Sequence, residues 1–204
     1  MKRKKHWETV YGTKFPNEVS WTQEIPKISL KLIDSFKLSK TAKIIDVGGG
    51  DSKLVDYLLQ EGFENISVLD ISEKALEKAK KRLGVKAKKI KWIACDITEF
   101  EPDTTYDVWH DRATFHFLTT NEQTTKYLET AKRCVGGYLI LGTFSEDGPK
   151  KCSGLAIKQY SEKTLTAQFK NGFTKMQCLL EKHTTPFNTT QNFLFCSFTK
   201  TYNI

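Results

Sequence analysis

The stretch Lys43–Ser52, KIIDVGGGDS, decides the fold of this chain. A short apolar run ends at Asp46, three glycines follow, and Asp51 and Ser52 can then cap a helix. The pattern predicts a buried strand that turns sharply into a helix. Glycines leave the backbone bare of side chains, so a ligand can approach the N–H groups at the positive end of the helix. The stretch therefore predicts a nucleotide-like ligand at this turn.

Strand patterns alternate with helix patterns along the rest of the chain. We expect strands at 42–47, 65–69, 89–94, 106–109 and 138–143, helices at 24–36, 52–60, 72–83, 120–134 and 161–169, and a terminal hairpin of 177–183 with 192–198. This order predicts an α/β, Rossmann-like, doubly wound sheet. The seven strands are mostly parallel, helices cover both faces, and the hairpin adds an antiparallel edge. Ligands of such folds bind at the carboxyl ends of the strands.

Length and composition favour one globular domain spanning 1–204. We divide it into an N-terminal lid and helix at 1–39, a cofactor-binding core at 40–145, and a substrate-side loop with the terminal hairpin at 146–204. No run of about 18 apolar residues is present, so we expect no membrane span, and the basic N-terminus lacks the apolar segment of a signal peptide. The five cysteines are scattered without a CxxC pair, which predicts reduced thiols in a cytoplasmic protein and no metal site.

The net charge of +8 has two interpretations. Nine of the basic residues lie between Lys74 and Lys91, mostly on one expected helix and the loop after it. A lysine-rich solvated helix face explains them without any ligand. A phosphate-bearing partner such as RNA is the sharper alternative.

The residues around the glycines discriminate between two kinds of cofactor. The dinucleotide-binding motif has a third glycine at the position of Lys53, and the Asp51 carboxylate would repel a diphosphate. Asp46, two residues before Gly48, suits a ligand with a positive charge. An NAD oxidoreductase is therefore disfavoured, although the turn alone leaves it open.

The run Asp46-x-Gly48-x-Gly50 resembles the signature of the class I S-adenosylmethionine-dependent methyltransferases. Four further elements resemble that family in order and spacing: Leu69-Asp70-Ile71, Cys95-Asp96-Ile97, Tyr106–Arg112 and Gly136–Leu141. The resemblance covers about residues 40 to 145, and the whole chain is similar to a group of short bacterial methyltransferases. It implies S-adenosyl-L-methionine as cofactor and S-adenosyl-L-homocysteine as product.

The resemblance also assigns cofactor-binding residues. It implies that the glycine loop passes under the amino-acid part of the cofactor, that Asp70 and Ile71 hold the ribose, and that Asp96 and Ile97 hold the adenine. Trp21 is expected to form part of a lid that excludes water from the sulfonium. The full cofactor-binding set is Trp21, Asp46, Gly48, Gly49, Gly50, Asp70, Ile71, Asp96, Ile97 and His110.

The segment His110–His116 is expected to lie beside the transferred methyl group. It looks like the Asp-Lys/Arg-Gly-Thr segment of two methyltransferase groups, one acting on protein lysines and one on thiols and thiopurines, with Ala113 in place of glycine. The catalytic candidates are His116, Asp111 and His110, because an imidazole or a carboxylate can accept a proton. The substrate-binding candidates are Arg112, Phe115, Cys152 and Tyr160. Core packing or an ion pair would explain the same residues structurally.

We expect a methyltransferase whose acceptor is a small molecule. A protein-lysine or RNA acceptor is the first alternative, and a non-catalytic S-adenosylmethionine-binding module is the second. The sequence leaves the acceptor atom and the oligomeric state open.

Overall fold

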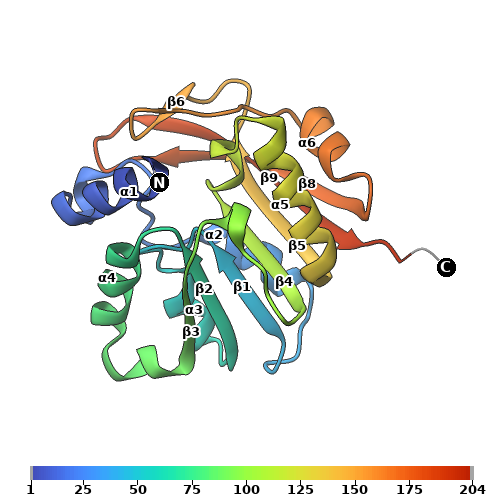
Figure 1. Ribbon diagram of the computed structural model, residues 1–204, viewed down its shortest axis with the longest axis horizontal. Coiled ribbons are helices and arrows are strands. Elements are labelled where there is room, and N and C mark those ends of the chain that lie inside the picture. Colours follow the sequence, from blue (N-terminus) through green and yellow to red (C-terminus); the bar gives the residue numbers. More distant parts are fainter. Residues whose placement is uncertain (1, 203–204) are drawn as a thin grey trace.

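A seven-stranded sheet forms the centre of the computed structural model, which describes residues 2–202 (Figure 1). Its strand order is β3-β2-β1-β4-β5-β9-β8. The strands are β1 Lys43–Val47, β2 Asn65–Asp70, β3 Ile90–Ala94, β4 Tyr106–Arg112, β5 Val135–Phe144, β8 Phe173–Thr184 and β9 Thr190–Lys200. The first five pair in parallel, and β9 and β8 add an antiparallel edge. The predicted Rossmann-like sheet is confirmed, and its order reverses between β1 and β4.

Helices cover both faces of the sheet. They are α1 Lys2–Thr13, α2 Lys27–Ser35, α3 Leu54–Gln60, α4 Glu73–Leu83, α5 Asn121–Cys134 and α6 Glu162–Phe169, with short 3₁₀ turns at Pro16–Glu18, Gly84–Lys89, Ile97–Glu99 and Phe115–Phe117. Apolar side chains of α2, α3 and α4 share one core with one face of the strands. Those of α5 and α6 share a second core with the other face. Successive strand residues point to opposite faces, so each buried strand supplies both cores.

Three helices begin at the hydroxyl residues that the sequence predicted. Ser72 Oγ accepts a hydrogen bond from Ala75 N at 3.2 Å at the start of α4. Thr120 Oγ1 accepts from Gln123 N at 3.3 Å, and the Gln123 side chain accepts from Thr120 N at 3.4 Å, which completes a capping box. Ser161 begins α6 in the same way. The Ser72 cap starts α4 directly after β2, whereas α5 begins after the 3₁₀ turn that follows β4.

Four strands, β4, β5, β8 and β9, are longer than predicted by three residues or more. β4 continues from Trp109 to Arg112, so the first three residues of the segment His110–His116, which was predicted to follow the strand, belong to it. β5 begins at Val135 and includes Gly136 and Gly137, which lie before the predicted strand at 138–143. A Cβ on Gly137 would lie 2.6 Å from Asp107 O, so glycine is needed there because the β4 backbone passes close by.

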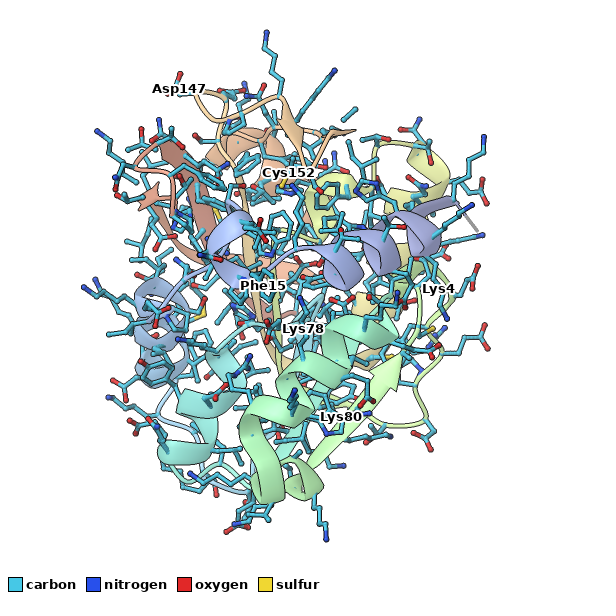
Figure 2. All side chains as sticks on the ribbon, turned by 90° about the vertical axis from the view of Figure 1, so that its left-hand side faces the viewer. Lys4, Phe15, Lys78, Lys80, Asp147 and Cys152 are labelled. Atoms are coloured by element: carbon cyan, nitrogen blue, oxygen red, sulfur yellow. A yellow bond between two sulfur atoms is a disulfide. The ribbon has the colours of Figure 1, made fainter. Side chains whose placement is uncertain are left out.

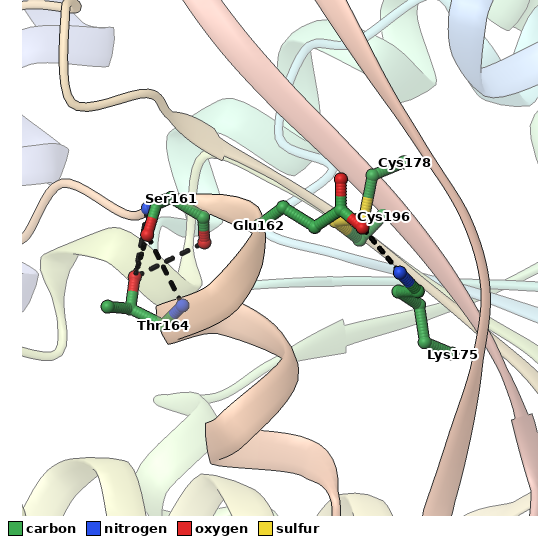
Figure 3. The surroundings of a disulfide bond; sticks show 6 residues. All are labelled: Ser161, Glu162, Thr164, Lys175, Cys178 and Cys196. Atoms are coloured by element: carbon green, nitrogen blue, oxygen red, sulfur yellow. Dashed lines mark hydrogen bonds and ion pairs between the residues drawn. A yellow bond between two sulfur atoms is a disulfide. The ribbon is translucent and has the colours of Figure 1, made fainter.

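The prediction of five reduced thiols is wrong for two cysteines. Cys178 and Cys196 form a disulfide between β8 and β9 (Figure 3). They are direct cross-strand partners with Cα atoms 4.1 Å apart. The sequence alone does not show that these two cysteines are neighbours, because that depends on the register in which the two strands of the hairpin pair. Cys95, Cys134 and Cys152 are free.

The helices of residues 2–202 include none with both the length and the apolarity needed to cross a lipid bilayer.

We expect the denatured, unreduced protein to contain three reactive thiols, because Cys178 and Cys196 are joined. Titration with a thiol reagent in denaturant measures this number. Cys178→Ser frees Cys196 and should add one reactive thiol. Five thiols in the wild-type protein would contradict the cross-strand pair.

Candidate active site

A cavity of about 640 Å³ lies at the carboxyl ends of β1, β2, β3 and β4. Small-molecule sites typically measure about 300–1,000 Å³. Most of the predicted site residues line it: Trp21, Asp46, Gly48, Gly49, Asp70, Ile71, Asp96, Ile97, His110, Arg112 and Cys152. Their common position follows from the parallel sheet, which brings the ends of these strands together.

The glycine turn forms the floor of this cavity. Gly48 N and Gly49 N both donate to Leu69 O, at 2.7 and 3.1 Å, which folds the chain tightly over the end of β2. Gly48 has a φ of 68°, and a Cβ there would overlap the Thr114 hydroxyl. The turn therefore needs glycine both for its backbone conformation and for its contact with Thr114.

Asp46 and His110 form a buried hydrogen-bonded pair between β1 and β4. His110 Nδ1 lies 2.7 Å from Asp46 Oδ1, and Nε2 lies 2.8 Å from Ser29 Oγ. A neutral imidazole fits both contacts by donating from Nδ1 and accepting the Ser29 hydroxyl proton at Nε2. Asp46 Oδ2 is sheltered from solvent and has no hydrogen-bond partner within residues 2–202. This carboxylate oxygen beside Gly49 is ready to accept from a cationic donor.

Asp70 is buried at the end of β2. Its Oδ1 accepts from Ser72 N at 2.8 Å, and burial raises the pKa of the carboxyl to about 7, with the Asp46 and Glu8 charges adding to the shift. A Cβ on Gly50 would lie 2.8 Å from the Tyr11 hydroxyl and 3.0 Å from Asp70 Oδ2. Tyr11 and Asp70 therefore meet above the glycine turn.

The helix α1 closes one side of the cavity. Its cavity-lining residues recur every three to four positions, so they lie on one face of the helix. Arg3, Trp7, Val10 and Tyr11 on α1, and Lys14 just after it, all line the cavity. Figure 2 shows this segment, from Lys4 to Phe15, running between α4, marked by Lys78 and Lys80, and the loop that carries Cys152. The spacing is helical, and the sequence therefore contained a signal for α1 that the prediction did not use.

Charged contacts hold α1 in this position. The Arg3 guanidinium donates to both Asp96 oxygens, at 2.7 and 3.0 Å. The Glu8 carboxylate accepts from Glu73 N at 2.6 Å, at the positive end of α4. Both contacts join α1 to segments that follow β2 and β3.

An aromatic cluster forms a further part of the cavity wall. Trp7 packs edge-on against Trp21 and Phe117, with ring centroids 5.6 and 5.2 Å apart. Tyr11 also packs against Trp21, at 6.3 Å. Trp7, Tyr11 and Phe117 were not among the predicted site residues, although Trp7 and Tyr11 lie in the segment 1–39 that was predicted as a lid and helix.

The remaining predicted residues lie behind the cavity wall. Phe115, His116 and Tyr160 are fully buried and do not line the cavity. His116 Nδ1 accepts from Phe144 N at 3.3 Å, and burial together with the Arg112 charge lowers the pKa of His116 to about 3. His116 is thus a neutral core residue. Gly50 also lies outside the lining, under Tyr11.

Asp111 braces the β4 end from the opposite face of the sheet. Its carboxylate accepts from Thr114 N at 2.9 Å, Phe115 N at 3.2 Å and the Tyr127 hydroxyl at 2.8 Å. Trp109 Nε1 donates to the same tyrosine hydroxyl at 2.9 Å. Burial raises the pKa of Asp111 to about 6. The geometry thus gives Asp111 and His116 structural contacts and no access to the cavity.

Three comparisons place the chain among known proteins. Residues 44–136 match the family model described as a methyltransferase domain. The eEF1A lysine and N-terminal methyltransferase of Mus musculus is 32% identical over 82 residues, which is 40% of this chain and 12% of that protein. The malonyl-[acyl-carrier protein] O-methyltransferase of Anoxybacillus flavithermus is 34% identical over 105 residues, or 50% of this chain and 39% of that protein. The chain thus spans less than half the length of either relative.

A solved structure shares the fold over nearly the whole chain. The 1,6-didemethyltoxoflavin-N1-methyltransferase of Burkholderia thailandensis, with bound S-adenosylhomocysteine, has a TM-score of 0.73. It is 16% identical, and the match covers 98% of this chain and 88% of that one. At this identity the likeness shows the fold.

By the match to the family model, residues 44–136 form a methyltransferase domain, and the fold around them is that of the S-adenosylmethionine-dependent methyltransferases. The cofactor of the chain is S-adenosyl-L-methionine. The cavity fits that molecule chemically, because the Asp46 oxygen without a partner suits an ammonium group and the bare glycine turn admits close contact.

We expect Tyr127→Phe to lower the free energy of unfolding by about 1–3 kcal/mol, because two buried polar groups lose their shared hydroxyl. Denaturant unfolding measures the change. Tyr138→Phe is the matched control, since this half-buried tyrosine stacks on Phe36 and makes no side-chain hydrogen bond in the described chain. Equal effects of the two substitutions would show that the hydrogen bonds of the Tyr127 hydroxyl do not add to the free energy of unfolding.

Proposed function

We propose that the protein transfers a methyl group from S-adenosylmethionine to a small molecule bound inside the cavity. The observation that carries this proposal is the position of α1, which covers the cavity with Trp7 and Tyr11. A covered, aromatic-walled site suits a small acceptor, and it excludes water from the reacting atoms.

In this proposal the residues at the ends of β1, β2 and β3 would hold the cofactor. Asp46 would accept from its ammonium group, the Gly48–Gly50 turn would contact its amino-acid part, and Asp70 would accept from the ribose hydroxyls. Asp96 and Ile97 would hold the adenine, with Arg3 orienting the Asp96 carboxylate. The cofactor supplies a methyl group already activated by its sulfonium, so the protein contributes positioning and desolvation.

The acceptor then occupies the part of the cavity near Trp21, Arg112 and Cys152. Burial raises the pKa of the Cys152 thiol to about 12, so this thiol stays protonated at neutral pH. His110 is held by Asp46 and Ser29. The nucleophile is therefore expected to be a group that ionises by itself, such as a thiol or an acid.

A protein acceptor is the second candidate. The similarity to the eEF1A lysine and N-terminal methyltransferase favours it. Release of S-adenosylhomocysteine with a panel of small thiols and acids, compared with release with total cell protein, tests the two candidates. Turnover with protein and none with small molecules would overturn the small-molecule proposal, and no calorimetric binding of S-adenosylmethionine would overturn the enzyme proposal.

We expect Gly48→Ala to weaken S-adenosylmethionine binding by about tenfold or more, because the new Cβ meets Thr114 and the backbone conformation is unfavourable for alanine by about 1–2 kcal/mol. Calorimetric titration measures the affinity. Gly62→Ala is the control, since Gly62 has a φ of 85° but open space around its Cβ. Unchanged affinity of Gly48→Ala would mean that the turn has a purely structural role.

We expect the affinity for S-adenosylmethionine to fall as the pH drops below about 7. Asp70 has a pKa of about 7 in the free protein, and its charged form accepts from the ribose, so binding competes with protonation. Well below pH 7 the affinity should fall by at most about tenfold for each pH unit, and well above pH 7 it should not change with pH.

Titrations between pH 5.5 and 8.5 measure this slope. Asp70→Asn should bind more weakly and remove the slope, whereas Asp103→Asn, at an exposed position, should keep it. An Asp70→Asn protein with wild-type affinity and slope would contradict the assignment of Asp70.

A further inference from the structure

The guanidinium of Arg112 is fixed at the end of β4, where it lines the cavity. Nη1 donates to Trp21 O at 3.0 Å. The guanidinium also lies over the Phe193 ring, 4.5 Å from its centroid. A hydrogen bond on one edge and a ring against one face leave the group little rotational freedom.

The opposite edge of this guanidinium has no partner. Nε and Nη2 are both sheltered from solvent, and neither makes a hydrogen bond to any residue from 2 to 202. In the same part of the chain, no carboxylate forms an ion pair with Arg112. Nε–H and one N–H of Nη2 point the same way, and this pair of donors matches the two oxygens of a carboxylate.

An unpaired buried cation is costly, which indicates that an anion belongs beside Arg112. Burial lowers its pKa to about 10, so the group remains cationic at neutral pH. Glu181 raises that pKa, and its Oε2 is also buried without a hydrogen-bond partner within residues 2–202. Its Oε1 accepts from Gln23 at 3.1 Å, it forms no ion pair with Arg112, and it does not line the cavity. Asp46 contributes in the same direction and is engaged with His110.

The surroundings of Arg112 describe the rest of the ligand. Trp21 connects the guanidinium of Arg112 with the aromatic wall, because its carbonyl accepts from Arg112 and its ring packs against Trp7. Phe117 extends this aromatic wall. A flat apolar body fits against such rings, with an acidic group placed at the guanidinium.

We propose that Arg112 recognises a carboxylate on the methyl acceptor, whose class is therefore small, planar, largely apolar carboxylic acids. This inference rests on the proposed small-molecule function. The two donors on the free edge of Arg112 bind both carboxylate oxygens, while the aromatic wall of Trp7, Trp21 and Phe117 holds the apolar body. Recognition depends on the shape of the edge as well as on its charge.

Calorimetric titration of the complex with S-adenosylhomocysteine tests this directly. The probes are indole-3-acetate with indole-3-acetamide and benzoate with benzamide, pairs that differ in one acidic oxygen. The wild-type protein should bind the acids at least about tenfold more tightly than the amides, because an amide leaves the buried cation unpaired. Equal binding of acids and amides, or binding of neither, would overturn the proposal.

Variants then separate recognition from bracing of the fold. Arg112→Gln should lose the preference for acids, and Arg112→Lys should retain a reduced preference because it keeps the charge without the paired donors. Glu181→Gln, which removes the nearby carboxylate, should keep the preference. If Arg112→Gln keeps the preference, or if Glu181→Gln abolishes it as completely, Arg112 is a structural partner of Glu181 and the proposal fails.

The cofactor measurements distinguish this proposal from the proposed function. Arg112→Gln should bind S-adenosylhomocysteine within about twofold of the wild-type protein and unfold at a similar temperature. If the wild-type protein binds no S-adenosylhomocysteine, the enzyme proposal fails, and titration of the free protein with the same acids still tests Arg112. Loss of both cofactor binding and thermal stability in Arg112→Gln and Arg112→Lys would show that Arg112 only braces the fold.

Discussion

The hydrogen bond between Asp46 and His110 is the interaction on which the site depends. It joins directly paired residues of β1 and β4, the two strands between which the sheet order reverses. Ser29 fixes the far nitrogen of the imidazole and so ties α2 to the same point. His110 contacts one oxygen of Asp46, and the other oxygen faces the glycine turn. A buried carboxylate oxygen without a partner destabilises the fold unless a ligand donates a hydrogen bond to it.

The cover over this site is held by weaker contacts than the core beneath it. The α1 helix has a single fully buried residue, Val10, and is held by ion pairs such as Arg3 with Asp96 and by Glu8 at the start of α4. Partly exposed ion pairs contribute about 0–1 kcal/mol and helix-end charges about 0.3–1 kcal/mol each. The β4 end, in contrast, is locked by the buried Asp111–Tyr127–Trp109 chain. The rigid half of the site is thus the sheet, and the more easily displaced half is α1.

Local chemistry explains which parts of the structure the sequence predicted. The capping residues Ser72, Thr120 and Ser161, together with the glycine turn, encode their own geometry within a few residues. The acids Asp46, Asp70 and Asp96 could be placed in one cavity because parallel strands end at one edge. The disulfide, the pairing of Asp51 with Arg82 and the contact of Arg3 with Asp96 depend on which distant segments meet. The helical spacing of Arg3, Trp7, Val10 and Tyr11 was present in the sequence, but the surface that α1 covers, from which much of its stability comes, could not be read from it.

The pleat of β4 explains why Asp111 does not reach the cavity although its neighbours His110 and Arg112 do. Because the segment is strand up to Arg112, His110 and Arg112 point to one face, while Trp109 and Asp111 point to the other. A loop from His110 onward would have allowed all of them to converge. The pleat gives the cavity a cation and a hydrogen-bonded imidazole, and it sends the carboxylate to the core. With His116 also buried, deprotonation by these residues is a poor route to a nucleophile. Acceptors that ionise unaided, such as thiols and carboxylic acids, suit a site whose fixed charge is Arg112.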